Sequence, residues 1–451
     1  MINDTIAAIS TPLGTGGISV IRISGDSAIS VAEKVFKGTK PLSDMAGYTA
    51  QFGHVYSGEN QLDECVATVF LAPKSYTGEN VVELSCHGGI LVTKNLLSEC
   101  LKSGARMAKP GEFSERAFLN GKMDLAKAEA VMGLISAKTN AALNIAAKNK
   151  SGAVSKKING IREILLNLLA SISAYCDYPD DESMGIDPDA FSKDALLVAA
   201  KLKELIKNYE NGKVYTTGLN VAIIGKPNVG KSTLMNYLSG ENRSIVTDIP
   251  GTTRDVIDTG IMLYDIPITL YDTAGIRETR DPIEKIGVKK SEDAIKYSDI
   301  CLFMFNPDDV ISEKDKKSLE EFKEKAIIVI NKTDIKDDCP KYLTDLKLPV
   351  VKICAKYEKG AKEIYEAIKH KAGVMDLEPD AVLLQSLRQK ENCRNALEET
   401  ENAIKAIKDD VTPDAVSVLL QSALTYLDEL TGAKASDEIV ERVFRDFCVG
   451  K

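Results

Sequence analysis

Residues 225–232 read Gly-Lys-Pro-Asn-Val-Gly-Lys-Ser, which completes the pattern G-x-x-x-x-G-K-S. The mostly apolar residues 220–224 before it predict a strand and residues 233–238 after it predict a helix, so the pattern stands in the context that it requires. Backbone N–H groups of such a loop turn toward phosphate oxygens, Lys231 adds a positive charge, and Ser232 offers a hydroxyl to Mg²⁺. We therefore expect a phosphate-binding loop, with contacts from Asn228, Val229, Gly230, Lys231, Ser232 and Thr233.

Two later motifs predict which nucleotide is bound. Asp272-Thr273-Ala274-Gly275 follows the apolar residues 268–271, where a carboxylate can reach Mg²⁺ and a glycine N–H can reach the γ-phosphate. Asn331-Lys332-Thr333-Asp334 follows the apolar residues 326–330, and its aspartate can accept hydrogen bonds from the N1 and N2 donors of guanine, which adenine lacks. The three motifs in this order predict GTP binding, with Asn331, Lys332 and Asp334 at the base.

The segment between the phosphate-binding loop and Asp272 is where a switch must lie. Thr253 is its natural second hydroxyl for Mg²⁺, and we assign catalytic roles to Lys231 and Asp272. Ile276 stands where other GTPases carry a glutamine that orients the attacking water, so another residue must orient it. The residues expected around the phosphates from these segments are Thr247, Asp248, Ile249, Pro250, Gly251, Thr252, Thr253, Asp272, Thr273, Ala274 and Gly275.

Periodicity divides the chain of 451 residues into four segments. Residues 1–120 carry short β-branched runs between glycine turns, and residues 218–373 alternate apolar strands with helices, so both predict α/β domains, the second with a mostly parallel sheet. Residues 121–217 and 374–451 have helical spacing, and each segment has an apolar face that needs a partner. We therefore expect one discontinuous helical domain, interrupted by the central α/β domain.

Glycines predict where two of the helices end. A helix from about Asp189 to Tyr209 should stop at Gly212, and a helix from Pro413 to Leu430 should stop at Gly432. Two further helices are expected over residues 383–407 and from about Ser436 onward.

The composition excludes several other classes of protein. Nine singly spaced cysteines argue against a disulfide framework or a cysteine zinc site, and three histidines leave little for histidine metal or triad chemistry. No apolar run reaches the ~20 residues that span a bilayer, so we expect a soluble, cytoplasmic protein without a membrane span. The net charge of −9 limits any contact with nucleic acid to a local patch or a shared surface.

Four further stretches carry a resemblance to a known family. They are Gly16–Gly25, Ser75–Asn80 with Glu83 and His87–Gly89, Pro110–Asn120, and the terminal Phe447–Lys451. With the phosphate-binding loop, they make the chain resemble the tRNA-modification GTPase family MnmE, also called TrmE, over its whole length. The resemblance implies an N-terminal α/β folate-binding domain, a discontinuous helical domain and an inserted Ras-like P-loop GTPase domain.

The resemblance implies a potassium-dependent GTPase that works as a homodimer and pairs its GTPase domains during hydrolysis. Glu284 matches the family's acidic residue that orients the attacking water. A cation beside the phosphates can neutralise developing charge, as an arginine finger does in other GTPases. The residues that match the family's potassium ligands are Asn228, Thr247, Ile249 and Thr252.

The resemblance also implies a one-carbon reaction on tRNA. Arg22, Glu83 and Lys122 match the family's contacts with 5-formyl- or methylene-tetrahydrofolate, and Lys451 matches a contact from the C-terminus. With an FAD-dependent partner, MnmG, the family installs a carboxymethylaminomethyl or aminomethyl group at the 5-position of the wobble uridine of certain tRNAs. Cys448 is either a reactive thiol in this chemistry or an inert cysteine.

The sequence departs from familiar patterns at two positions, and two alternative functions are considered. Cys354 stands where GTPases usually carry the serine of Ser-Ala-Lys, and Ser386 stands where the family more often has asparagine. The first alternative is a GTP switch that binds RNA in ribosome assembly. The second is a membrane-associated GTPase, which the lack of an apolar span or polybasic tail makes a weaker candidate. Five basic residues either contact tRNA or form a solvated helix face, namely Lys148, Lys150, Lys156, Lys157 and Arg162.

Overall fold

The computed structural model describes residues 4–177, 188–241, 258–272, 296–373, 381–445 and 447–450. The chain divides into two compact units. The first unit consists of Met1–Met132, Asn149–Lys203 and Ser386–Lys451, and the second of Gly133–Lys148 and Glu204–Gln385. The bounds of the four segments expected from periodicity stay a prediction.

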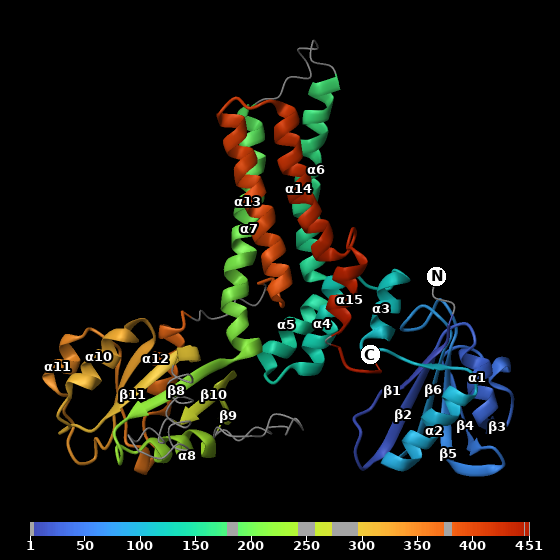
Figure 1. The fold of residues 1–451 in the computed structure, drawn as a ribbon, viewed down its shortest axis with the longest axis horizontal. Helices are drawn as coiled ribbons and strands as arrows, with labels where there is room; N and C mark the ends of the chain where they lie inside the picture. Colours follow the sequence, from blue (N-terminus) through green and yellow to red (C-terminus); the bar gives the residue numbers. More distant parts are fainter. Residues whose placement is uncertain are drawn as a thin grey trace, which may run out of the picture. The chain divides into compact units, whose positions relative to one another are not determined.

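A seven-stranded sheet forms the N-terminal part of the first unit, in the order β3-β4-β5-β6-β2-β1-β7. Its pairs are antiparallel except for β1 with β7. Helices α1 and α2 pack on the sheet and share an apolar cluster with it (Figure 1). The elements are β1 (Ile6–Ile9), β2 (Gly16–Ser24), α1 (Ala28–Val35), β3 (Phe36–Gly38), η1 (Leu42–Asp44), β4 (Thr49–Ser57), β5 (Asn60–Phe70), β6 (Val81–Gly88), α2 (Ile90–Lys102), β7 (Arg106–Met107) and α3 (Glu112–Leu119).

Long helices form the rest of the first unit. α6 (Ala153–Asp177) packs against α14 (Pro413–Thr431), which packs against α13 (Leu387–Lys408), so helical residues from before and after the central domain share one bundle (Figure 1). α15 (Asp437–Arg445) packs near α3, and Phe444 and Phe447 join Leu125 in an apolar cluster. α4 (Leu125–Ser136) and α7 (Pro188–Thr217) begin in the first unit and continue into the second, which also contains most of α5 (Asn140–Lys150). No helix in the described ranges is long and apolar enough to cross a bilayer.

The second unit contains a six-stranded sheet in the order β13-β12-β11-β8-β10-β9. Only β9 runs antiparallel to its neighbour, so the expected mostly parallel sheet is confirmed. α8 and α12 join the apolar cluster on one face, and α10 and α11 join the cluster on the other. The elements are β8 (Leu219–Gly225), α8 (Lys231–Glu241), β9 (Asp258–Leu263), β10 (Ile266–Asp272), β11 (Ile300–Phe305), α10 (Glu313–Glu321), η3 (Lys323–Lys325), β12 (Ala326–Ile330), α11 (Lys341–Asp345), β13 (Val350–Lys352), η4 (Ala355–Tyr357) and α12 (Ala361–Lys371).

The central strands of this sheet form where the sequence is continuously apolar. Every residue of β11 and of β12 is buried, because helices cover both faces of the sheet. Parallel strands end at one edge, so the segments that follow β8, β10, β12 and β13 all start at the same edge of the sheet. Ligands of such folds bind outside the carboxyl ends of the strands.

The end of α7 corrects one expectation. The helix runs through Gly212 to Thr217, and it stops at Gly218, whose φ of 79° is the left-handed conformation of a helix-ending glycine. A Cβ atom at Gly212 would lie 3.1 Å from a methyl carbon of Leu383, so this glycine makes room for close packing instead. Gly432, with φ of 89°, does end α14 as expected.

Two other elements differ from the expectations. α13 begins at Leu387 rather than at residue 383, because the Ser386 hydroxyl accepts a hydrogen bond from the Gln389 N–H and caps the helix there. β9 was not expected from the sequence. It is an edge strand, and its first residues, Asp258 to Gly260, do not have the apolar run that predicted the other strands.

Candidate functional site

The phosphate-binding loop connects the carboxyl end of β8 to the start of α8 at Lys231. Two of its residues have a left-handed backbone, Asn228 with φ of 67° and Gly230 with φ of 100°. A Cβ atom at Gly230 would lie 2.3 Å from the side-chain nitrogen of Asn331, so only glycine fits at this position. The loop and the helix N-terminus together form the type of anion site that the sequence predicts.

The Lys231 ammonium group is held inside this loop. Its side chain is buried, and Nζ donates to the carbonyl oxygens of Gly225 at 2.8 Å and Lys226 at 3.0 Å. Ser232 and Thr233 follow in the first turn of α8 and are exposed. A fixed cation and an accessible hydroxyl are therefore adjacent at the positions where a nucleotide's phosphates and its Mg²⁺ would need them.

The base-recognition motif is bonded directly to the phosphate-binding loop. Asn331 is buried, and its Nδ2 donates to the carbonyl oxygen of Val229 at 2.7 Å, while its Oδ1 accepts from the N–H of Ala355 at 3.1 Å. Lys332 Nζ donates to the carbonyl oxygen of Asn228 at 2.9 Å. The Asn331 and Lys332 side chains thus tie together three segments that follow different strands.

Asp334 is the exposed end of this motif, and a cysteine supports it. The Cys354 thiol donates to Asp334 Oδ1 at 3.0 Å, and Cys354 itself is buried. Each carboxylate oxygen offers two lone pairs, so Asp334 can still accept from a ligand. The thiol replaces the hydroxyl that a serine would present at this position, and the sequence alone did not indicate this contact.

Many of the expected GTP-site residues lie outside the described residues. They are Thr247, Asp248, Ile249, Pro250, Gly251, Thr252, Thr253, Thr273, Ala274, Gly275 and Glu284. Asp272 is the last residue of β10, at the same edge as the phosphate-binding loop, and its side chain is also outside the description.

A second candidate site lies on the N-terminal sheet of the first unit. Arg22 on β2 is the register partner of Glu83 on β6, and its NH2 atom lies 2.8 Å from Glu83 Oε1. The Arg22 guanidinium also lies 5.4 Å from the centroid of the Tyr76 ring and 5.7 Å from that of Phe113. A cation, a carboxylate and the partly exposed Tyr76 ring therefore meet at one place, which suits a flat ligand with polar edges, whereas the Phe113 ring is fully buried.

Lys122 and Lys451 are the other two expected residues of this site, and the described part of the chain shows no polar contact of Lys122 with Arg22 or Glu83. Lys122 Nζ donates to the carbonyl oxygen of Pro73 at 2.9 Å, on the loop that also carries Tyr76. Lys451 lies outside the described residues, but Gly450 before it accepts from Arg22 NH1 at 3.3 Å and from the Ser10 hydroxyl at 3.1 Å. The chain's last described residue thus contacts Arg22. Tyr76 was missed as a site residue, although it lies in one of the motifs that carry the resemblance.

A buried ion-pair network holds one of those motifs in place. Arg116 donates to Asp4 and Glu112, and Arg106 NH2 donates to Glu112 Oε1 at 2.6 Å. Burial raises the pKa of Glu112, but hydrogen bonds from Arg106 and Lys109 N–H and the charge of Arg116 outweigh it, so the pKa lies below its usual value. The network is therefore charged at neutral pH and anchors α3.

The second unit has the phosphate-binding loop, the base-recognition motif and a mostly parallel sheet that presents both at one edge. This combination defines the class of P-loop GTP-binding proteins.

Comparison with known proteins places the chain within that class. Residues 125–448 match the MnmE helical domain, and residues 5–122 match the GTP-binding protein TrmE N-terminus. A "tRNA modification GTPase MnmE" of Acetivibrio thermocellus is 40% identical over 99% of this chain and 99% of that protein. Proteins of the same description from Desulforamulus reducens and Carboxydothermus hydrogenoformans are 40% and 41% identical over 100% of both chains. The chain belongs to the MnmE (TrmE) family and is a GTPase.

Proposed function

We propose that this GTPase modifies tRNA. With an FAD-dependent partner, MnmG, it installs a carboxymethylaminomethyl or aminomethyl group at the 5-position of the wobble uridine, using a tetrahydrofolate one-carbon unit. The observation that carries the proposal is the 40% identity over 99% of the chain with a tRNA modification GTPase, which includes both candidate sites. The protein acts as a cytoplasmic homodimer.

In the GTP site, we assign each residue a role in binding or hydrolysis. Lys231 neutralises the phosphates, and Ser232, Thr253 and Asp272 hold Mg²⁺. Glu284 orients the attacking water in place of the glutamine that is absent at position 276. When bound, Mg²⁺ and K⁺ supply positive charge beside the phosphates.

The residues for potassium are Asn228, Thr247, Ile249 and Thr252. Asn228 fits this role because it is exposed in the phosphate-binding loop, so its side-chain amide oxygen is accessible to a cation. Oxygen atoms of amide, hydroxyl and carbonyl groups are suitable ligands for such a hard ion.

Hydrolysis will depend on the monovalent cation. We expect the GTPase rate to be on the order of a hundredfold higher in KCl than in NaCl at equal ionic strength, because the cation stabilises charge that develops in the transition state. Steady-state phosphate release in the two salts measures this. Equal rates would remove the potassium assignment.

In the N-terminal site, we assign the folate to Arg22, Glu83, Lys122 and Lys451. The Arg22 and Lys122 cations suit the carboxylates of a folate, Glu83 suits the N–H donors of its pterin, and the partly exposed Tyr76 ring offers aromatic surface.

Arg22→Ala will weaken binding of 5-formyl-tetrahydrofolate about tenfold to a hundredfold, because one charge-assisted contact is lost. Arg22→Lys keeps the charge and should bind with intermediate affinity. Calorimetric titration of folded variants measures the effect. Unchanged affinity of the alanine variant would contradict the assignment of Arg22.

Mass spectrometry of tRNA tests the function as a whole. Cells that lack this protein should lose the 5-substituent of the wobble uridine, and a plasmid copy should restore it. A copy carrying Lys231→Ala should not restore it. Wobble uridines that keep their full modification in the deletion strain would overturn the proposal.

A further inference from the structure

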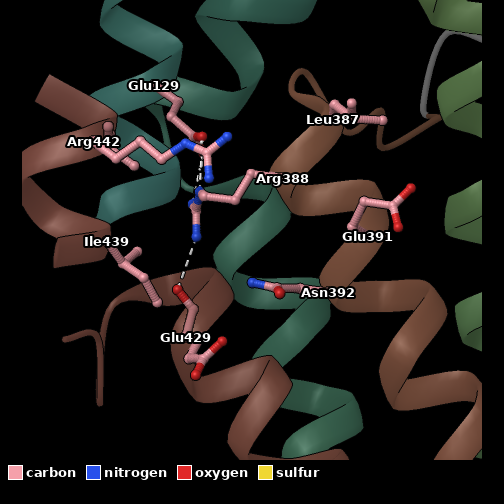
Figure 2. A pocket seen from close by; sticks show the side chains of 9 residues that line it. Glu129, Leu387, Arg388, Glu391, Asn392, Glu429, Ile439 and Arg442 are labelled. Carbon is pink, nitrogen blue, oxygen red and sulfur yellow. Dashed lines mark hydrogen bonds and ion pairs between the residues drawn. The ribbon is translucent and has the colours of Figure 1, made fainter. Parts of the chain in front are cut away.

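Four helices of the first unit line an open pocket that has no part in either site described above. Its volume is about 500 Å³, within the ~300–1,000 Å³ range of ligand-binding pockets. α4 contributes Glu129, α13 contributes Arg388 and Asn392, α14 contributes Glu429, and α15 contributes Arg442. We call this the junction pocket, and Figure 2 shows these side chains around it.

Two of the charged residues in the junction pocket neutralise each other. Arg388 donates through NH2 to Glu129 Oε2 at 2.9 Å and through NH1 to the carbonyl oxygen of Glu429 at 2.9 Å (Figure 2). Glu129 also accepts from Ser386 and from Gln389. Arg388 and Glu129 therefore hold the walls together and have little capacity left for a ligand.

Three other polar groups of the pocket lack such partners. Asn392 is only 9% exposed, and Figure 2 shows its amide reaching into the pocket from α13. Within the described ranges, no hydrogen bond or ion pair is found for the side chains of Asn392, Arg442 and Glu429. The Asn392 amide atoms are not among the fully buried polar atoms that lack a partner, so they are accessible from the pocket and can bond a ligand.

The chemistry of the three groups narrows the class of ligand. The Arg442 guanidinium is a fork of donors that fits a phosphate or carboxylate. The Asn392 amide pairs one donor and one acceptor, which complements the edge of a nucleobase. The Glu429 carboxylate accepts from N–H or hydroxyl donors, and Ile439 supplies an apolar wall.

We propose that the junction pocket binds one unstacked nucleotide of RNA, with its phosphate on Arg442 and its base edge on Asn392. The inference rests on the proposed function, in which the substrate is a tRNA, because single-stranded loops splay bases outward for such recognition. An inorganic anion alone would leave Asn392 and Glu429 without partners, which is why a nucleotide fits the pocket better.

Binding of uridine 5′-monophosphate to the full-length protein tests this directly. GDP and Mg²⁺ are added in excess to occupy the GTP site, and binding is followed by ligand-observed NMR and calorimetry. We expect Arg442→Ala to weaken binding about tenfold to a hundredfold. Arg445→Ala, which removes the same charge from the exposed surface of α15, should change affinity less than about threefold and serves as the matched control.

Ribose 5-phosphate tests the base contact. The unmodified protein should prefer uridine 5′-monophosphate, and Asn392→Ala should lose that preference while it keeps its affinity for ribose 5-phosphate. Because the comparison is made between two ligands on one folded variant, a general loss of stability would not imitate the result. Equal binding of inorganic phosphate, no binding of any nucleotide, or equal effects of Arg442→Ala and Arg445→Ala would each overturn the proposal.

A synthetic anticodon stem-loop separates this proposal from the proposed function. If Arg442→Ala binds the stem-loop as tightly as the unmodified protein and still restores wobble modification in deletion cells, only the pocket assignment fails. If deletion cells keep their modified uridines, the proposed function fails regardless of the pocket.

Discussion

Lys231→Ala will lower the GTPase rate by about a thousandfold, because it removes a preorganised cation from phosphates whose charge shifts during transfer. The structure gives the reason for a large effect. Lys231 Nζ is fixed by the carbonyl oxygens of Gly225 and Lys226, so the charge is positioned before the nucleotide arrives. Single-turnover hydrolysis of GTP in KCl measures the loss.

Lys226→Ala is the matched control for this experiment. Lys226 belongs to the same loop, but its Nζ donates to the carbonyl oxygen of Val310 at 2.6 Å and lies 3.7 Å from Asp315. We expect its rate to change less than about threefold, because the pair is partly exposed and contributes little. Equal losses in the two variants would mean that the loop responds to net charge, and the special role of Lys231 would be abandoned.

Strands that are apolar throughout could be predicted from the sequence to the residue. β11 and β12 are examples, because every position of a strand covered on both faces must be apolar. β9 could not be found in this way, because it is an edge strand that begins with polar residues and glycine. The prediction of where α7 ends failed for a different reason. Both Gly212 and Gly218 are possible stops in sequence, and only packing against Leu383 distinguishes them.

The two sites differ in how much the sequence alone revealed. The phosphate-binding loop is one continuous segment between β8 and α8. Its sequence pattern is therefore enough to predict its backbone conformation. The pairing of Arg22 with Glu83 depends on the register of two antiparallel strands. The resemblance implied that both residues contact the folate, but neither it nor the spacing indicated that they pair. The Cys354–Asp334 contact joins residues twenty positions apart, after different strands, and appears only once β12 and β13 are aligned.

Asp334→Ala will lower the affinity for GTP by about a thousandfold, because guanine N1 and N2 each lose a charge-assisted hydrogen bond. Inosine triphosphate lacks the N2 donor, so the substitution will lower its affinity less than that of GTP. The ratio of the two affinities will therefore fall toward unity. Competition with a fluorescent nucleotide measures both affinities. A preference that survives the substitution would mean that another group reads the base.

Two further variants separate recognition of the base by Asp334 from the support that Cys354 gives to Asp334. Cys354→Ala removes the thiol that donates to Asp334 Oδ1 but leaves the carboxylate, so we expect about a tenfold loss or less. Asp334→Asn places a donor where the carboxylate accepted, and xanthine has a carbonyl at C2 where guanine has its amino group. That variant should therefore prefer xanthosine triphosphate to GTP. A gain for xanthosine triphosphate cannot come from a damaged fold, so this reversal assigns base selection to Asp334 more firmly than any loss of binding.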